Sequence, residues 1–152
     1  MIRQAAYKDI PRLAELMREL HACSRYSHYQ LQIKRFKDLC LHSIRSGNGC
    51  VFVSGNDDQI EGFIIGMVDD LYHVLQPKYA TDLFFYVSER DQVNAPGLID
   101  AFIDWAWSEP NVVSIRLCAT DAVVDYTRTA KLYKRKGFVQ EGEMYEMKRI
   151  SK

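Results

Sequence analysis

Residues 82–97 read Asp-Leu-Phe-Phe-Tyr-Val-Ser-Glu-Arg-Asp-Gln-Val-Asn-Ala-Pro-Gly, and a helical pattern of apolar residues begins at Leu98. The first six residues form a nearly unbroken apolar run, which is typical of a central strand covered on both faces. The small residues after it open a helix, whose first turn directs N–H groups and the positive end of the helix dipole at one point. This unit predicts a phosphate site, unless Asn94 serves only to cap the helix.

The chain before this unit predicts a strand, two helices and a hairpin. Asp9 supplies a side-chain acceptor at a helix start, and Pro11 lies in the first turn, where its missing N–H does no harm. Apolar residues then recur at helical spacing, while the turn Gly-Asn-Asp-Asp joins two apolar strands. The predicted elements are a strand over 1–6, a helix over 9–20, a helix over 31–44, and strands over 50–53 and 60–68.

The chain after the unit predicts two more helices and three short strands. Leu98 starts an apolar helical stripe that ends before Pro110, and residues 113–118 alternate as a strand does. A helix over 126–136 ends at Gly137, and residues 138–147 predict two short strands around a Glu-Gly turn. With 152 residues and no linker or repeat, the chain is predicted to form a single domain over 1–152.

The charge balance argues against a nucleic-acid partner. Lys plus Arg equals Asp plus Glu at 20 each, so the chain carries no overall field that would hold a polyanion or an anionic membrane. The charges are unevenly distributed, because residues 56–70 are acidic and residues 128–152 are mainly basic. These clusters are either solvated faces or an acidic acceptor side and a basic side that faces phosphate.

The cysteines and the apolar runs set further expectations. Cys23, Cys40, Cys50 and Cys118 form no Cys-x-x-Cys pair and the histidines show no zinc spacing, so buried free thiols and no metal are expected. The longest apolar run, residues 62–68, is too short to span a bilayer, and the N-terminal residues do not resemble a signal peptide. The expected location is therefore the cytoplasm, without membrane attachment.

Leu132-Tyr133, followed three residues later by Gly137-Phe138, resembles the ending of the GNAT acyltransferases. The order of predicted elements also resembles that family, and residues 84–87 with the helix from Leu98 resemble its acyl-CoA segment. The resemblance spans essentially the whole chain. It implies an α+β fold with a mixed, mostly antiparallel central sheet of about six to seven strands, flanked by about four helices.

The family's phosphate loop reads Gln/Arg-x-x-Gly-x-Gly/Ala, and this chain matches it in two possible registers. Gln92 and Gly97 fit one register, with Ala95 in place of the middle glycine. Arg90 and Ala95 fit the other, with Val93 in place of that glycine.

The loop is about two residues shorter than usual, and its proline removes one N–H group. Thr127 also stands where family members often carry Asn. The resemblance implies contacts with acetyl-CoA from Phe85, Tyr86, Val87, Arg90, Gln92, Val93, Asn94, Ala95, Gly97 and Thr127.

The resemblance also implies a mechanism, in which an amine attacks the acetyl thioester directly. Tyr133 stands where the family has its general acid, although a Tyr beside Leu on a helix is more often part of the core. Asp82 is the first candidate and Asp70 the second for the base that deprotonates the amine, and both could instead be strand-end caps. The acceptor would meet Tyr26, His28 and Tyr29 in the loop between the first two helices.

The sequence is compatible with three functions. The first is an N-acetyltransferase that acts on a small-molecule or protein amine, with a homodimer possible because relatives are often dimers. The second is a degenerate relative that binds an acyl-CoA or a protein without turnover, for which the altered loop is the reason. The third is a relative that modifies a nucleobase or tRNA, for which the basic residues over 128–136 are the only indication.

Overall fold

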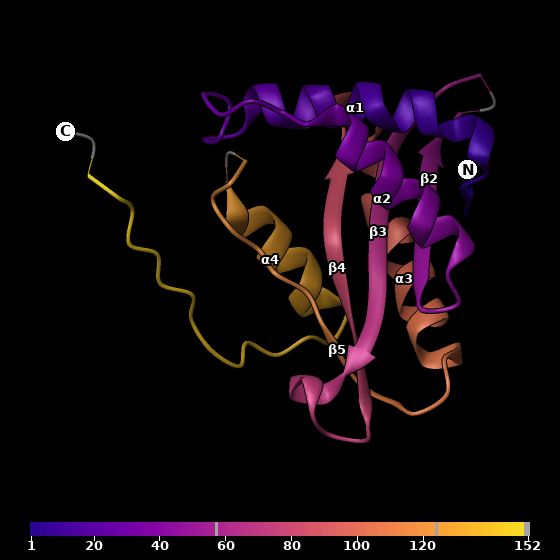
Figure 1. Cartoon of the computed structure of the whole chain (residues 1–152), viewed down its shortest axis with the longest axis vertical. Helices are drawn as coiled ribbons and strands as arrows, with labels where there is room; N and C mark the ends of the chain where they lie inside the picture. Colours follow the sequence, from indigo (N-terminus) through magenta and orange to yellow (C-terminus); the bar gives the residue numbers. More distant parts are fainter. Residues whose placement is uncertain (57, 124, 151–152) are drawn as a thin grey trace.

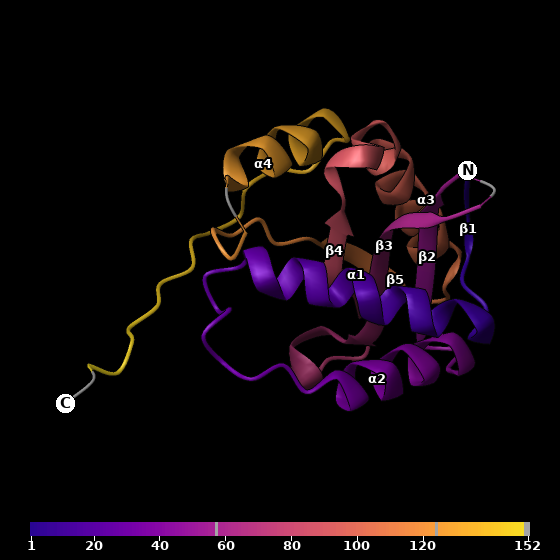
Figure 2. The ribbon, with the colours of Figure 1, turned by 90° about the horizontal axis from the view of Figure 1, so that it is seen from above.

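Four α-helices cover the two faces of one β-sheet in the computed structural model, which describes residues 1–56, 58–123 and 125–150. Figure 2 shows α1 and α2 on one face and α3 and α4 on the other. The strands are β1 (Ile2–Gln4), β2 (Gly49–Gly55), β3 (Ile60–Asp70), β4 (Lys78–Val87) and β5 (Val112–Arg116). The helices are α1 (Ile10–Cys23), α2 (Ile33–Arg45), α3 (Ala95–Ser108) and α4 (Tyr126–Arg135), and short 3₁₀ turns cover Tyr7–Asp9, Leu71–His73 and Glu89–Asn94.

The sheet is mixed and mostly antiparallel, as predicted, with five strands in the order β1-β2-β3-β4-β5. The first three pairings are antiparallel, and β4 pairs with β5 in parallel. The predicted α+β class is confirmed, while the predicted count of six to seven strands was slightly too high.

The missing strands are those predicted within residues 138–147, which form no strand in the structure. The segment runs away from the body of the molecule in both views (Figures 1 and 2). Its large apolar side chains Val139, Met144, Tyr145 and Met147 are all exposed, and no described strand pairs with the segment. A strand needs a neighbour for its backbone hydrogen bonds, and this segment has none among the described residues.

Side chains from the two faces of β3 enter two separate cores. Phe63 and Ile65 pack under α1 and α2, whereas Ile64 packs with Phe102 of α3. Gly66 lies so close to the Phe102 ring that a Cβ atom there would overlap it. Close helix-to-sheet contact on this face therefore depends on a glycine at position 66.

The start of α1 differs from the expected cap. The helix begins directly after Asp9, but the Asp9 carboxylate accepts hydrogen bonds from the Ala6 N–H (2.8 Å) and the Arg3 guanidinium (2.7 and 3.0 Å) rather than from the helix. The 3₁₀ turn before α1 directs this side chain back toward β1. Within the described residues, no helix is long and apolar enough to cross a membrane.

Candidate active site

The two parallel strands β4 and β5 separate partway along the sheet. Their pairing runs only from Lys78 to Thr81 on β4, although β4 continues to Val87. The Ser88 N–H donates to Glu61 O of β3 (2.9 Å), and strand residues alternate in direction, so the peptide groups of Phe85 and Val87 face away from β3. β4 therefore presents an open backbone edge beyond Thr81, on the side where α4 lies (Figure 1).

A β-bulge at Leu83 sends the side chains on either side of it to opposite faces. Asp82 is opposite Gly66 and Phe84 is opposite Ile65, which leaves Leu83 as the extra residue. Phe84 therefore packs with the α1 and α2 core, whereas Asp82 faces the side that carries α4. The bulge thus places an acidic side chain beside the open edge.

Asp82, Cys118 and Tyr133 meet at this edge from three different segments. The Tyr133 hydroxyl lies 3.5 Å from the carbonyl oxygen of Cys118, to which it donates a long hydrogen bond. The Asp82 Oδ1 atom is buried without a hydrogen-bond partner among the described residues. An unpaired buried carboxylate oxygen is costly, and it marks the place where a ligand's donor would be stabilised.

Burial shifts the protonation of all three groups. It raises the pKa of Asp82 from 3.8 to about 6, with a backbone N–H of Cys118 offsetting part of the shift. It also raises the pKa of Tyr133 well above its usual value, and the nearby Asp82 and Cys118 act in the same direction. Cys118 is an exposed residue, but partial desolvation of its thiol, followed by the charge of Asp82, raises the pKa of that thiol. At neutral pH the cluster thus holds a carboxylate that can accept a proton and a phenol that retains its own.

The ring of Tyr133 is packed in the core, whereas its hydroxyl group reaches the edge of β4. Its side chain is 6% exposed, and its ring lies 5.8 Å from that of Phe138, centroid to centroid. Only its hydroxyl reaches the Asp82 edge. Cys118, which sequence reasoning did not place at a site and expected to be buried, is exposed, as is Cys23.

The predicted phosphate loop is a 3₁₀ turn over Glu89–Asn94 that leads into α3. Gln92 folds back and donates from Nε2 to the carbonyl oxygens of Val87 (2.7 Å) and Ser88 (3.2 Å). Asn94 occupies the N-cap position without a side-chain cap bond, and its amide donates to Asp91 instead. The Val93 side chain is exposed, and Ala95 and Gly97 lie in the first turn of α3.

Asp91 is a buried acid at the start of α3 that sequence reasoning missed. Its carboxylate accepts from the Ser54 hydroxyl (2.7 Å) and the Asn94 amide (2.6 Å). The Asp91 and Ala95 N–H groups are bonded to Ser88 O and Gln92 O, within the turn itself. Part of the anion-binding capacity of this loop is therefore already used by the protein.

Arg90 is held by acidic side chains. Its guanidinium lies 2.8 Å from Glu61 and 3.2 Å from Glu19. Burial alone would raise the pKa of Glu61, but hydrogen bonds from Arg90 and Ser88 outweigh it and hold that pKa below its usual value. Within the predicted acidic segment 56–70, Glu61 is thus a buried structural acid, while Asp57 lies outside the described residues.

The remaining predicted residues are dispersed. Asp70, the second candidate base, ends β3 and pairs with Lys78 at 2.7 Å, away from the Tyr133 cluster. Tyr86 directs its ring toward α1, where its hydroxyl donates to Glu19 (3.3 Å). Thr127, in the first turn of α4, donates to the Asp125 carboxylate through both its N–H and its hydroxyl.

The predicted acceptor loop reaches the segment between β5 and α4. The Arg25 N–H donates to Ala122 O (2.9 Å), and the Tyr26 hydroxyl donates to Glu146 of the C-terminal segment (3.3 Å). His28 stacks obliquely on Tyr29, and both are exposed. These aromatic side chains therefore lie on a loop that touches the segment leading from Cys118 to α4.

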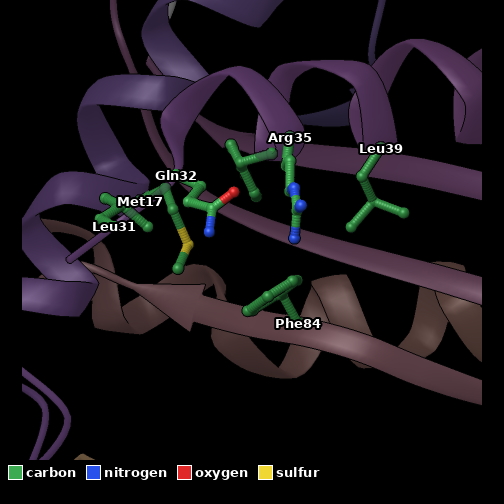
Figure 3. Close-up of a pocket in the computed structure, with 7 residues that line it drawn as sticks. Met17, Leu31, Gln32, Arg35, Leu39 and Phe84 are labelled. Carbon is green, nitrogen blue, oxygen red and sulfur yellow. The ribbon is translucent and has the colours of Figure 1, made fainter. Parts of the chain in front are cut away.

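A cavity of about 230 Å³ on the other face of β4 was not anticipated from the sequence. Figure 3 shows side chains from α1, α2 and β4 around it. Its lining is formed by Met17, Leu31, Gln32, Arg35, Phe36, Leu39 and Phe84. The available signal was the stripe Leu31, Arg35 and Leu39, in which a cation interrupts apolar residues at a spacing of four.

Solved structures of acetyltransferases share this architecture over the whole chain. An aminoglycoside acetyltransferase, meta-AAC0020, from an uncultured soil metagenomic sample is 19% identical with a TM-score of 0.72, covering 100% of this chain and 96% of its own. A putative acetyltransferase from Agrobacterium tumefaciens is 16% identical, with a TM-score of 0.73 and 98% and 99% covered. A ribosomal-protein-alanine N-acetyltransferase from Brucella melitensis is 16% identical, with a TM-score of 0.69 and the same coverage.

No family model and no curated protein sequence matches the chain. The strand order, the separation of β4 from β5 and the full-length structural matches define the class of fold. The chain has the fold of the GNAT acetyltransferases. At identities of 16–19% the likeness is one of fold.

Proposed function

We propose that this chain is an N-acetyltransferase, which moves an acetyl or related acyl group from acetyl-CoA to a primary amine by direct attack. The observation that carries the proposal is the unpaired, buried Oδ1 of Asp82 beside Tyr133, at the open edge of β4. A buried carboxylate oxygen without a donor is costly, and the edge of β4 beyond Thr81 has unpaired backbone groups beside it. A substrate that lies along this edge would supply both.

The residues at the edge fit the cofactor's amide-bearing arm. The peptide groups of Phe85 and Val87 face outward and can pair with amide groups as a neighbouring strand would. The first turn of α3, with Ala95 and Gly97, would hold the phosphates through its N–H groups, and Thr127 lies in the first turn of α4. Acetyl-CoA would supply the activated acyl group at this edge.

Asp82 is the proposed base. An amine attacks only when it is neutral, and a carboxylate with a pKa of about 6 is ionised at neutral pH, yet basic enough to take a proton. Its position in a half-buried strand keeps bulk water from competing for that proton. A bound ammonium would also provide the partner that Oδ1 lacks.

Tyr133 is the proposed acid, which returns a proton to the departing thiolate. Its raised pKa keeps the phenol protonated at neutral pH. The partial desolvation that raises the pKa of the Cys118 thiol would also make a free thiolate costly at this place, so protonation of the leaving group is favoured. Tyr26, His28 and Tyr29 would contact the acceptor, a small-molecule or protein amine.

A second candidate is a binding module that holds an acyl-CoA without turnover. Asp91 favours a relative that has lost part of the family's cofactor site, because a buried carboxylate at the start of α3 weakens the binding of a phosphate there, and the turn uses two of its own N–H groups. In that case the same edge of β4 would bind the amide-bearing arm of the acyl-CoA, and no amine acceptor would bind beside it.

The test measures acetyl-CoA binding by calorimetry and CoA release with a panel of primary amines. Tyr133→Phe should lower kcat by about 100-fold and leave the acetyl-CoA Kd unchanged, because only the proton is removed. Tyr126→Phe, at the exposed start of the same helix, is the matched control and should keep the wild-type rate. Binding without CoA release from any amine would establish the binding module instead, and no binding at millimolar acetyl-CoA would refute both.

A further inference from the structure

The cavity between α2 and β4 has the size and lining of a site for one apolar group. Its volume is about 230 Å³, and it opens to solvent rather than being enclosed in the core. Five of its seven lining residues are apolar, namely Met17, Leu31, Phe36, Leu39 and Phe84. A phenyl ring or a branched aliphatic chain would fill it and leave room for a polar substituent.

The lining of the cavity includes one positively charged side chain, that of Arg35. Arg35 is exposed on α2 and has no ion pair or hydrogen bond among the described residues. Figure 3 shows its guanidinium extending from α2 toward Phe84, on the cavity side of the helix. By contrast, the neighbouring Lys34 is paired with Asp38 at 3.1 Å.

The charged residue at the cavity favours a ligand with a negatively charged group. None of the lining residues is acidic, and Gln32 is the only other polar one. A guanidinium matches the planar geometry of a carboxylate and binds it through two parallel hydrogen bonds. A polycationic amine would instead meet repulsion from Arg35.

The cavity lies close to the proposed reaction centre along the strand. Phe84 is two residues from Asp82 on β4, which is at most about 7 Å between Cα atoms. The bulge at Leu83 turns Phe84 toward the cavity and Asp82 toward Tyr133. No described strand pairs with β4 beyond Thr81, so the cavity face and the Asp82 face of the sheet meet along this open edge.

We propose that the cavity is the acceptor subsite for an amine that carries both an aromatic or branched aliphatic group and a carboxylate. The apolar group fills the space between α2 and Phe84, and the carboxylate pairs with Arg35. This inference rests on the proposed acetyltransferase function for the role of the amine. The binding of the apolar acid itself does not depend on turnover.

The binding test uses 3-phenylpropanoate and its uncharged amide, 3-phenylpropanamide, as probes, titrated by calorimetry without any acyl-CoA. The wild-type protein should bind the acid at least about tenfold more tightly than the amide, as expected for a charge-assisted pair. Arg35→Gln should abolish this preference. Lys37→Gln removes a neighbouring exposed charge from α2 and should retain it. Equal affinity for both probes, no saturable binding, or the same loss in Lys37→Gln would overturn the proposal.

A cavity-filling variant and a turnover assay test the acceptor subsite separately from the proposed acetyltransferase function. Leu39→Trp should weaken binding of both probes, with a folded far-UV spectrum as the check. In the assay, Arg35→Gln should lower kcat/KM for L-phenylalanine at least tenfold and leave L-phenylalaninamide unchanged. If the acid probe binds through Arg35 but no amine is acetylated, the subsite stands and the acetyltransferase function fails. If only a polycationic amine such as an aminoglycoside is acetylated, with no effect of Arg35, the subsite fails and the function stands.

Discussion

Replacing Asp82 by Asn should stabilise the protein at neutral and alkaline pH. Burial raises the pKa of this carboxyl group from 3.8 in the unfolded chain to about 6 in the folded one. The folded state therefore holds its proton more tightly, and stability falls as the pH rises from about 4 to about 6. Well above pH 6 the carboxyl group is ionised in both states, and the loss of stability caused by its burial no longer changes with pH. A shift of about 2 units at 1.36 kcal/mol each gives up to about 3 kcal/mol.

The assay is urea denaturation of the wild type and Asp82→Asn at pH 3.5 and pH 8. The variant should have nearly the wild-type free energy of unfolding at pH 3.5, where the folded carboxyl group is protonated and the unfolded one mostly so, and exceed it by up to about 3 kcal/mol at pH 8. Asp70→Asn, at an exposed strand end with Lys78 as its partner, is the matched control and should show no such gain. An identical difference between wild type and Asp82→Asn at both pH values would refute the raised pKa.

The same substitution tests the catalytic role. The wild-type kcat/KM should rise with pH through an apparent pKa near 6, because the ionised carboxylate is the active form. Asp82→Asn should be at least about 100-fold slower and lack that rise. A variant that is more stable at pH 8 but equally active would leave Asp82 as a strained residue without a role in proton transfer.

Three further outcomes are expected. Gly66→Ala should cost about 1–3 kcal/mol of unfolding free energy, since the new methyl group meets the Phe102 ring; urea denaturation at pH 7 measures this, and an unchanged midpoint would contradict the close packing. Arg90→Gln should lower the free energy of unfolding at pH 7, because the buried Glu61 loses one of its two charged partners and keeps only Arg12, and urea denaturation measures this. Glu61 stabilises the fold above its usual pKa and loses this effect as the pH falls through its lower folded value, so the Arg90→Gln deficit should shrink at pH 3.5. Tyr133→Phe should leave the thermal midpoint within about 2 °C of wild type, since the hydroxyl makes only a long hydrogen bond, and a large drop would mean that Tyr133 serves chiefly to hold the core.

Local patterns along the chain were sufficient for most of the fold. The apolar stripe before Leu20 predicted α1, the run before Val87 predicted β4, and Gly137 marked the end of α4. These signals are local because the period of burial is a property of each element. The strands predicted after Phe138 were wrong, because a strand also needs a partner strand, which the local pattern does not specify.

The candidate site was less predictable than the fold. Tyr133 and Asp82 were anticipated, and the structure brings them together. Asp91, Glu61 and the Arg35 cavity were not, since each depends on contacts between residues far apart in the chain. A charged residue has no local signature that distinguishes a solvated position from a buried pair.

The sequence by itself determined the order of the helices and strands, the α+β class and the resemblance that singled out Tyr133, because periodicity and motif spacing are written along the chain. Only the tertiary structure decided which acid meets that tyrosine. The register between β3 and β4 leaves Leu83 as a bulge, and this one extra residue turns Asp82 toward α4 and Phe84 toward α2. Strand register is set by packing across the whole sheet. The sequence alone therefore does not show that Asp82 and Phe84, two residues apart on β4, face opposite sides of that sheet.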